Sequence, residues 1–234
     1  MTNLESLISA VITIGVAYNP SKDSIKLPAL QSLLTAANES LIALKTAESA
    51  NFTAIDVREL AFKPTGSLFT KVSNALKASN SSIQADETAK TILRKLQGKR
   101  ASAKLTDEEK TALEAEGKEV NQISASQMGY DERVDNFEKL ISFLQSIPDY
   151  NPNEEELKIE TLQTLLTDLK VKNGEVMKIY FVLETARGVR NDLLYKPLSG
   201  VVDLAADVKS YIKSVFGATS TQYKLVSKLR FATH

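Results

Sequence analysis

One stretch of about eighteen residues occurs twice in this chain. YNPSKDSIKLPALQSLLT begins at Tyr18, and YNPNEEELKIETLQTLLT begins at Tyr150, 132 residues later. A Lys-Pro pair that ends at Pro64 in the first half has a counterpart that ends at Pro197 in the second. Chance similarity between amphipathic segments would not keep Asn-Pro, Lys-Pro and their spacing together. The repetition therefore predicts a chain built from two related copies.

The match extends in both directions from these stretches. NLESLIS at Asn3 is similar to NFEKLIS at Asn136, and ILRKLQ at Ile92 is similar to LVSKLR at Leu225. The predicted parts are a first helical repeat, a connecting segment and a second helical repeat: 1–97, 98–135 and 136–234.

Both copies have the pattern of helices. The chain has only 9 Gly and 6 Pro, which favours long helices with few turns over many short strands. Apolar residues recur three and four positions apart, the spacing of a helix that buries one face. Because proline fits the first turn of a helix but not its interior, the long second helix should begin near Pro28, and near Glu160 in copy two. Short first helices are expected over 4–16 and 137–147. The predicted fold class is all-α.

Shorter signals predict how these helices are connected. Apolar and polar residues alternate around Ile25, which predicts a brief extended segment before the long helix. The Lys-Pro pairs should end each long helix and open a third helix at Pro64 and Pro197. Gly217 should end the third helix of copy two, and Ser220 should cap a short last helix.

The segment between the copies also has helical periodicity. A capping box begins at Thr106, and apolar residues keep the phase of one helix face through Gly117 and Gly129. This pattern predicts one continuous helix from about 106 to 146 that joins the copies. The expected architecture is an elongated antiparallel helical bundle with coiled-coil packing, forming one structural unit.

Composition excludes several classes of catalytic site. Cysteine is absent and the only histidine is His234, so thiolate catalysis, Ser–His catalysis and Cys or His metal sites lack their key residue. No glycine-rich phosphate loop is present. We therefore expect a protein that is not an enzyme and that has no cofactor or metal. The N-terminal apolar run has no Lys or Arg before it and is too short to span a bilayer, which indicates a soluble cytoplasmic protein.

Two arginines occupy matching positions near the ends of the two long helices. Arg58 precedes Lys63, and Arg190 precedes Lys196, each pair next to the repeated proline. Such a pair could bind a phosphate or carboxylate. The alternative is a structural joint, in which arginine pairs with a carboxylate of the protein or stabilises the end of a helix. The repetition favours the joint.

Basic residues also gather in two short segments. The chain is neutral overall, with 29 Lys and Arg against 29 Asp and Glu, so no global field attracts nucleic acid. No aromatic residues are interleaved for base stacking, and an acidic segment follows the first group, so an ordinary solvated surface is favoured over a nucleic-acid contact. The candidate residues for such a contact are Arg94, Lys95, Lys99, Arg100, Lys224, Lys228 and Arg230.

The second copy resembles a family of tandem-repeat helical proteins of Bacteroidota to which no function is assigned. The resemblance rests on the Tyr-Asn-Pro turn, on the segment VRNDLLYKP that ends at Pro197, and on FGATS from Phe216. Copy one departs from the last of these motifs. The resemblance implies a helical fold and implies nothing about activity, ligand or partner.

These observations predict a helical scaffold that works through protein–protein contacts, with a partner or with itself. Two alternatives remain open at this stage. One is a nucleic-acid-binding protein that uses the basic segments near 90–104 and 224–230. The other is a membrane-active protein that exposes the apolar face of its first helix, although a membrane partner is not favoured. No small-molecule substrate is evident.

Overall fold

A computed structural model describes residues 1–99, 106–116 and 128–231, and every regular element in these ranges is a helix. The chain divides into two compact units. Unit 1 comprises Met1–Phe52 and Lys178–His234, and unit 2 comprises Thr53–Met177. The prediction of an all-α fold is confirmed for the described residues.

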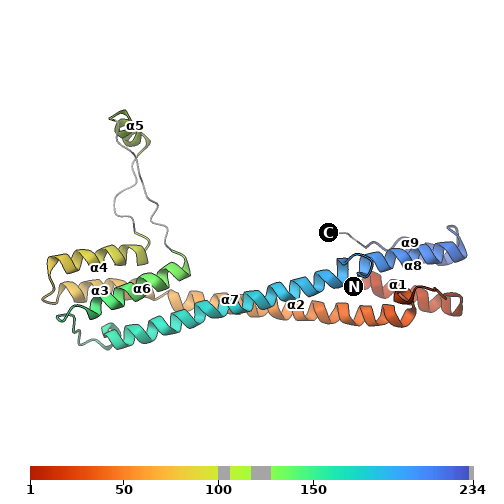
Figure 1. The fold of residues 1–234 in the computed structure, drawn as a ribbon, viewed down its shortest axis with the longest axis horizontal. Helices are drawn as coiled ribbons and strands as arrows, with labels where there is room; N and C mark the ends of the chain where they lie inside the picture. The colour runs from red at the N-terminus through yellow and green to blue at the C-terminus, as the bar shows by residue number, and fades with distance from the viewer. Residues whose placement is uncertain (100–105, 117–127, 232–234) are drawn as a thin grey trace. The chain divides into compact units, whose positions relative to one another are not determined.

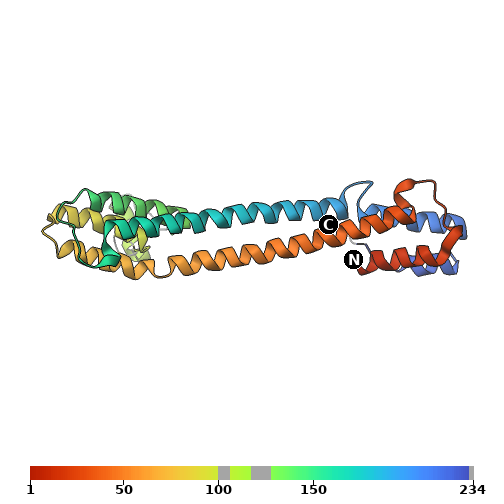
Figure 2. The same ribbon diagram turned by 90° about the horizontal axis from the view of Figure 1, so that it is seen from below.

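Unit 1 combines helices from the two ends of the chain. Helices α1, α8 and α9 contact one another (Figure 2). A 3-10 turn, η2, contacts α8. The unit also contains the first part of one long helix, α2, and the last part of the other, α7. The bounds are α1 Thr2–Ile14, η1 Gly15–Ala17, η2 Asp23–Ile25, α2 Leu27–Phe62, α7 Ile159–Tyr195, α8 Val201–Phe216 and α9 Thr221–Ser227.

Unit 2 is continuous in sequence and contains the other parts of the two long helices. Helix α4 contacts both α3 and α6, which lie below it in the view of Figure 1, and the 3-10 turn η3 contacts α3. Helix α5 belongs to the same stretch of sequence. The bounds are α3 Thr65–Lys77, α4 Ile83–Leu96, α5 Asp107–Ala115, α6 Tyr130–Gln145 and η3 Glu155–Leu157.

Each unit has its own apolar core, and the two cores use corresponding residues. In unit 1, α1 buries Leu4, Leu7, Ile8 and Val11. In unit 2, α6 buries the residues 133 positions later, which are Phe137, Leu140, Ile141 and Leu144. The spacing explains the burial, since residues three and four apart lie on one face of a helix.

The repeated Tyr-Asn-Pro stretch forms the same corner in both units. The buried Tyr18 hydroxyl donates a hydrogen bond to the Ile25 carbonyl at 2.7 Å, and Tyr150 donates to Leu157 at 2.9 Å. These bonds tie each corner to the residue two positions before the start of the long helix. The prediction of an extended segment there is wrong, because the residues around Ile25 form a 3-10 turn. Alternation of polarity over so few residues does not separate the two conformations.

The predicted ends of the helices are mostly confirmed. Helix α2 begins at Leu27 and α7 at Ile159, within a residue of the predicted starts. Pro64 is the N-cap of α3. Gly217 ends α8 with a φ of 85°, and the Ser220 hydroxyl caps α9 by accepting a hydrogen bond from a backbone N–H.

The joint after Pro197 differs from the prediction. Helix α8 begins at Val201, so Pro197 does not open it. Leu198 adopts a φ of 67°, which is unfavourable for a residue with a side chain. Its N–H donates to the Asp203 carboxylate at 2.8 Å, and Gly200 follows where a Cβ would lie 2.8 Å from the Leu194 carbonyl oxygen. The extra residues between Pro197 and Val201 therefore form a tight turn.

The prediction of one helix from 106 to 146 is wrong. Residues 128 and 129 are not helical, and α6 begins at Tyr130 with Gly129 as its N-cap at a ψ of 153°. Helix α5 ends at Ala115. Gly117 lies outside the described residues. The regular three- and four-residue spacing of apolar residues continues across this break. Such spacing indicates which positions are apolar on each side, but it does not require one unbroken helix.

The compact units do not coincide with the sequence repeats. Unit 1 takes α1, its corner and the start of α2 from repeat 1, and α8 and α9 from repeat 2. Unit 2 takes α3 and α4 from repeat 1, and α6, its corner and the start of α7 from repeat 2. The first half of each repeat is thus packed against the second half of the other.

Candidate functional site

Arg58 lies at the joint between α2 and α3, in unit 2. Its guanidinium carbon lies 3.8 Å from the centre of the Tyr130 ring, a cation–π contact. Its Nη1 donates to the side-chain oxygen of Asn173 at 3.2 Å. The Asn173 amide in turn donates to the Asp131 carboxylate at 2.6 Å. Asn173 therefore connects the arginine to a carboxylate that Arg58 does not contact directly.

Arg133 is the residue that holds the α2–α3 joint against α6. Its Nη2 donates to the Thr65 hydroxyl oxygen at 2.9 Å and to the Phe62 carbonyl at 3.2 Å. Thr65 also donates to the Phe62 carbonyl, at 2.7 Å. The last carbonyls of a helix have no partner within the helix, so Arg133 and Thr65 satisfy one at the end of α2. Burial lowers the pKa of Arg133 from its usual value.

Aromatic rings complete this joint. The Phe62 and Tyr130 rings meet edge to face, with centroids 4.9 Å apart. The Arg133 guanidinium lies 4.8 Å from the Phe62 ring centre. Lys63 is exposed and lies in the wall of an open pocket of about 360 Å³ that Glu59, Tyr130 and Arg133 also line. The structure thus places Lys63 beside this joint. The Arg58 guanidinium contacts a neutral amide, that of Asn173, and an aromatic ring, that of Tyr130.

The matching joint in unit 1 has different contacts. Arg190 is half-buried, and its Nε, like those of Arg58 and Arg133, is buried with no hydrogen-bond partner in the part of the chain that the structure describes. Lys196 is exposed, and its carbonyl accepts a hydrogen bond from the Gly200 N–H at 2.7 Å. Leu41 stands in unit 1 where Asn173 stands in unit 2, 132 residues later, so the amide that Arg58 contacts has no counterpart there. The two joints share their position and not their partners.

These contacts support the structural reading of Arg58. Arg58 and Arg133 make short contacts to groups of the protein that fix the end of α2. Nothing in this geometry positions a nucleophile beside a general base. Binding of an external anion by either Arg–Lys pair stays a prediction.

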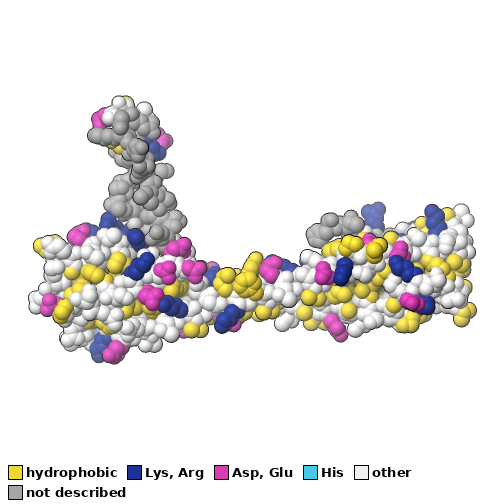
Figure 3. Space-filling view, viewed as in Figure 1, with side chains coloured by type: hydrophobic (Ala, Val, Ile, Leu, Met, Phe, Trp, Pro, Cys, Tyr) yellow, Lys and Arg dark blue, Asp and Glu magenta, His cyan; other side chains and the backbone are white. Residues whose placement is uncertain are grey.

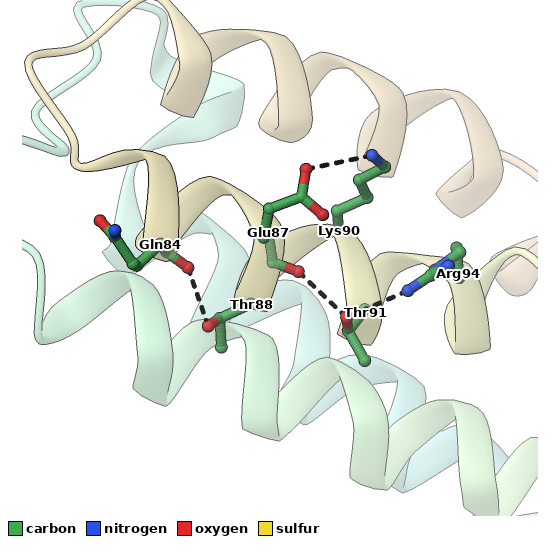
Figure 4. A network of polar contacts seen from close by, with 6 residues as sticks. All are labelled: Gln84, Glu87, Thr88, Lys90, Thr91 and Arg94. Carbon is green, nitrogen blue, oxygen red and sulfur yellow. Dashed lines mark hydrogen bonds and ion pairs between the residues drawn. The ribbon is translucent and has the colours of Figure 1, made fainter. Parts of the chain in front are cut away.

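The first basic segment lies on α4. Figure 4 shows polar contacts along one exposed face of this helix. Lys90 forms an ion pair with Glu87 at 3.1 Å, and Arg94 donates to the Thr91 hydroxyl at 3.2 Å. Lys95 and Lys99 are exposed. Arg100 lies outside the described residues.

The second basic segment lies on α9 and after it, in unit 1. Lys224 and Lys228 are exposed, and the Arg230 carbonyl accepts a hydrogen bond from the Asn3 side chain at 2.7 Å. The two basic segments therefore belong to different compact units. Contact with nucleic acid through them stays a prediction.

Three residues of the α2–α3 joint have no signal in the sequence. Tyr130 and Arg133 belong to the segment that was expected to be a plain helix, and Asn173 lies within the apolar pattern of α7. Asn173 has no equivalent at the matching position of copy one, where Leu41 stands 132 residues earlier. Arg133 contacts Thr65 and Phe62, which are 68 and 71 residues away in the sequence. Local sequence patterns could not identify such distant partners.

Comparisons with protein-family models, with curated proteins and with solved structures found no match to this chain. Within the ranges that the structure describes, no helix is both long enough and apolar enough to cross a membrane.

Proposed function

We propose that this protein is a non-enzymatic helical scaffold that works through contacts between proteins. The observation that carries the proposal is a row of exposed apolar side chains on the part of α7 that belongs to unit 1. Phe181, Val182 and Val189 are 64%, 60% and 50% exposed. We call these three residues the α7 row.

The α7 row lies on one side of its helix. Val182 and Val189 are seven residues apart, which brings them to the same face. Leu183 lies on another face and is buried with Leu44 and Ala47 of α2. Figure 3 shows hydrophobic side chains at the surface along the long helices. Since burying one such side chain contributes about 1.5–3 kcal/mol, contact with an apolar surface of another protein would be favourable.

Sequence repetition supports a duplicated origin for this scaffold. The corner hydrogen bonds of Tyr18 and Tyr150 match, and α1 and α6 bury residues 133 positions apart. We propose that the two copies arose by duplication of one helical repeat. The elongated form of the bundle stays a prediction.

The test uses the variant F181S/V182S and a control, Ile12→Ser. Ile12 is also exposed, at 52%, and lies in the same unit on α1. Light scattering after size exclusion, over a range of concentrations, measures self-association. Cross-linking of the tagged protein in cells, with mass spectrometry of the cross-linked peptides, measures contact with another protein.

We expect the wild type and the Ile12→Ser control to associate by one of these routes through α7. The double variant should lose at least about ten-fold in apparent affinity, the equivalent of about 1.4 kcal/mol. Circular dichroism should show all three proteins equally helical. A monomer at every concentration, with cross-links that F181S/V182S leaves unchanged, would contradict the proposal.

A further inference from the structure

Each corner packs against a helix, α8 in unit 1 and α3 in unit 2. At one position of this helix, unit 1 has a large side chain and unit 2 has a small one. The buried residues of α8 align with those of α3 when each lies 136 positions further along the chain. This offset exceeds the 133 between Pro64 and Pro197 because extra residues follow Pro197. The pairs are Val201 with Thr65, Ala205 with Phe69, Val208 with Val72 and Ile212 with Leu76. In this register Tyr211 of α8 corresponds to Ala75 of α3.

In unit 1 the side chain of Tyr211 fills the corner. Its ring meets the Tyr18 ring edge to face, with centroids 5.2 Å apart. Its hydroxyl oxygen accepts a hydrogen bond from the Asn19 N–H at 3.0 Å. Pro20, the next residue, is buried. A phenol ring is therefore part of the finished corner in this unit.

In unit 2 the small side chain of Ala75 leaves an open pocket of about 650 Å³. Tyr150, Asn151 and Asn74 line this pocket. The Asn151 N–H corresponds to the Asn19 N–H of the other corner, but it donates a hydrogen bond to the Asp149 carbonyl at 3.1 Å. Pro152, which corresponds to the buried Pro20, also lines the pocket and is only half-buried. A volume of this size is ordinary for a small-ligand site.

The charges around this pocket favour a cation. Lys71 is in its wall but forms an ion pair with Glu156 at 2.7 Å. Asp149 and Glu154 also line the pocket, which leaves it net negative. The carboxylates are not arranged to hold a metal ion in the part of the chain that the structure describes. Position 154 corresponds to Lys22 in the other corner, so the negative charge is specific to unit 2.

We propose that the pocket at the corner of unit 2 binds a phenol ring that carries a positively charged group. The ring takes the position that Tyr211 occupies in unit 1, against Tyr150 and the Asn151 backbone. The positive group lies near Glu154 and Asp149. This chemistry is present in a small aromatic amine and in a tyrosine that is flanked by lysines in a partner protein. The inference is independent of the α7 row.

The test is a titration of the intact ¹⁵N-labelled chain, followed by NMR. The probes are tyramine, neutral phenol and 4-hydroxyphenylacetate, which carries the opposite charge. We expect saturable shifts of the Asn74 and Asn151 amides. Tyramine should bind a few-fold more tightly than phenol, as for one exposed ion pair, and 4-hydroxyphenylacetate more weakly than phenol. Absence of saturable shifts with tyramine and phenol would overturn the proposal.

Two reciprocal variants test the fit of the ring. Ala75→Tyr copies the unit 1 corner into unit 2, and it should weaken tyramine binding at least ten-fold. Tyr211→Ala opens the unit 1 corner, and it should add a second set of shifts at Asn19 on titration with phenol. Undiminished tyramine binding by a folded Ala75→Tyr variant would overturn the proposal.

Glu154→Lys reverses one charge in the pocket wall, and it reproduces the lysine of the other corner. It should remove the preference for tyramine over phenol, measured as the ratio of their affinities. A preserved preference would contradict the proposed position of the cation. This variant also decides the question if Ala75→Tyr proves unstable.

A short peptide separates the two sources of the ligand. Tighter binding of acetyl-Lys-Tyr-Lys-amide than of tyramine would assign the pocket to a partner protein. Equal or weaker binding of the peptide would assign it to a small aromatic amine. Failure of both to bind would overturn the proposal.

Discussion

Arg133 shows how much one side chain contributes to the joint between α2 and α3. It donates to the Phe62 carbonyl and to the Thr65 hydroxyl, and Thr65 is 1% exposed. An acceptor that loses its donor in a buried position costs free energy. The ring contact with Phe62 adds to the packing. The joint therefore depends on a residue of α6, outside the two helices that it connects.

Arg133→Met should lower the free energy of unfolding by about 1.5–3 kcal/mol, the range for hydrogen bonds to a charged group. Urea unfolding at pH 7, followed by circular dichroism, measures the change. Arg94→Met is the matched control, since the Arg94 side chain donates to the Thr91 hydroxyl of its own helix on the exposed face of α4 in Figure 4. The control should change stability by less than about 0.5 kcal/mol. Equal losses in both variants would contradict the assigned role of Arg133.

Tyr150 should make stability fall at high pH. Burial, with a contribution from Glu154, raises the pKa of its hydroxyl to about 12 from the ordinary value of 10.0. The unfolded chain then ionises first, so the stabilisation is present below pH 10 and is lost as the pH rises toward 12. The slope is at most about 1.4 kcal/mol per pH unit for one group.

Tyr150→Phe checks this pH dependence. The variant loses the hydrogen bond to Leu157, so it should be about 1 kcal/mol less stable at pH 7. Its stability should fall less steeply than that of the wild type between pH 10 and 12. Urea unfolding at several pH values measures both effects. A wild-type slope that the variant reproduces would show that Tyr150 does not titrate as described.

Sequence reasoning reached Arg58 because it is repeated at Arg190, but it did not reach the partners of Arg58. The repeat fixes where an arginine lies along its helix. The ring of Tyr130 and the amide of Asn173 come from other helices, and copy one has Leu41 at the position that matches Asn173. Contacts between distant segments have no local pattern, so only the folded structure shows them.

At the scale of helices, two glycines of the chain have opposite effects on stability. Gly200 is buried in the turn before α8, and a Cβ there would lie within 2.9 Å of three backbone atoms. Gly188 lies inside α7, and a Cβ there would meet nothing within 4 Å. The first glycine is required by a close approach of the backbone. The second only weakens its helix.

Gly200→Ala and Gly188→Ala should therefore change stability in opposite directions. Gly200→Ala should destabilise the protein by about 1–3 kcal/mol, because backbone atoms have to move. Gly188→Ala should stabilise it by about 0.5–1 kcal/mol, the difference in helix propensity. Thermal unfolding of both variants beside the wild type measures the signs. A stabilising Gly200→Ala would contradict the close approach.

Helices were predicted better than the connections between them. The starts of α2 and α7 followed from Pro28 and its aligned position, since proline restricts where a helix begins. The break before Tyr130 did not follow from the sequence, because glycine is only mildly unfavourable within a helix and the apolar phase continued across it. The start of α8 was misplaced because the extra turn after Pro197 has no counterpart in copy one.

At the scale of the whole chain, each compact unit is made from both halves of the sequence. Unit 2 packs α6 against α4, and unit 1 packs α1 against α8 and α9. The core of unit 2 contains Phe69 from one side and Phe137 from the other, with ring centroids 5.1 Å apart. These contacts join residues that precede the α4–α6 link to residues that follow it.

Cleavage between Glu116 and Met128 should therefore leave the protein assembled. A recognition sequence for a specific protease, inserted within 117–127, provides the cut. We expect both fragments to elute together in native size exclusion and to separate in urea. The uncut protein with the same insertion is the control. Separate elution of the fragments under native conditions would contradict the shared cores.

The composition of unit 1 has a consequence during synthesis on the ribosome. Unit 2 is one continuous stretch and can fold as soon as residue 177 has emerged, whereas α1 packs against α8 and α9, which are made later. At about 5–20 residues per second, α1 is synthesised roughly ten to forty seconds before α8 begins. During that interval Leu4, Leu7 and Ile8 lack the part of their core that α8 and α9 supply. The nascent chain therefore presents a partly uncovered apolar helix to chaperones until α8 and α9 arrive.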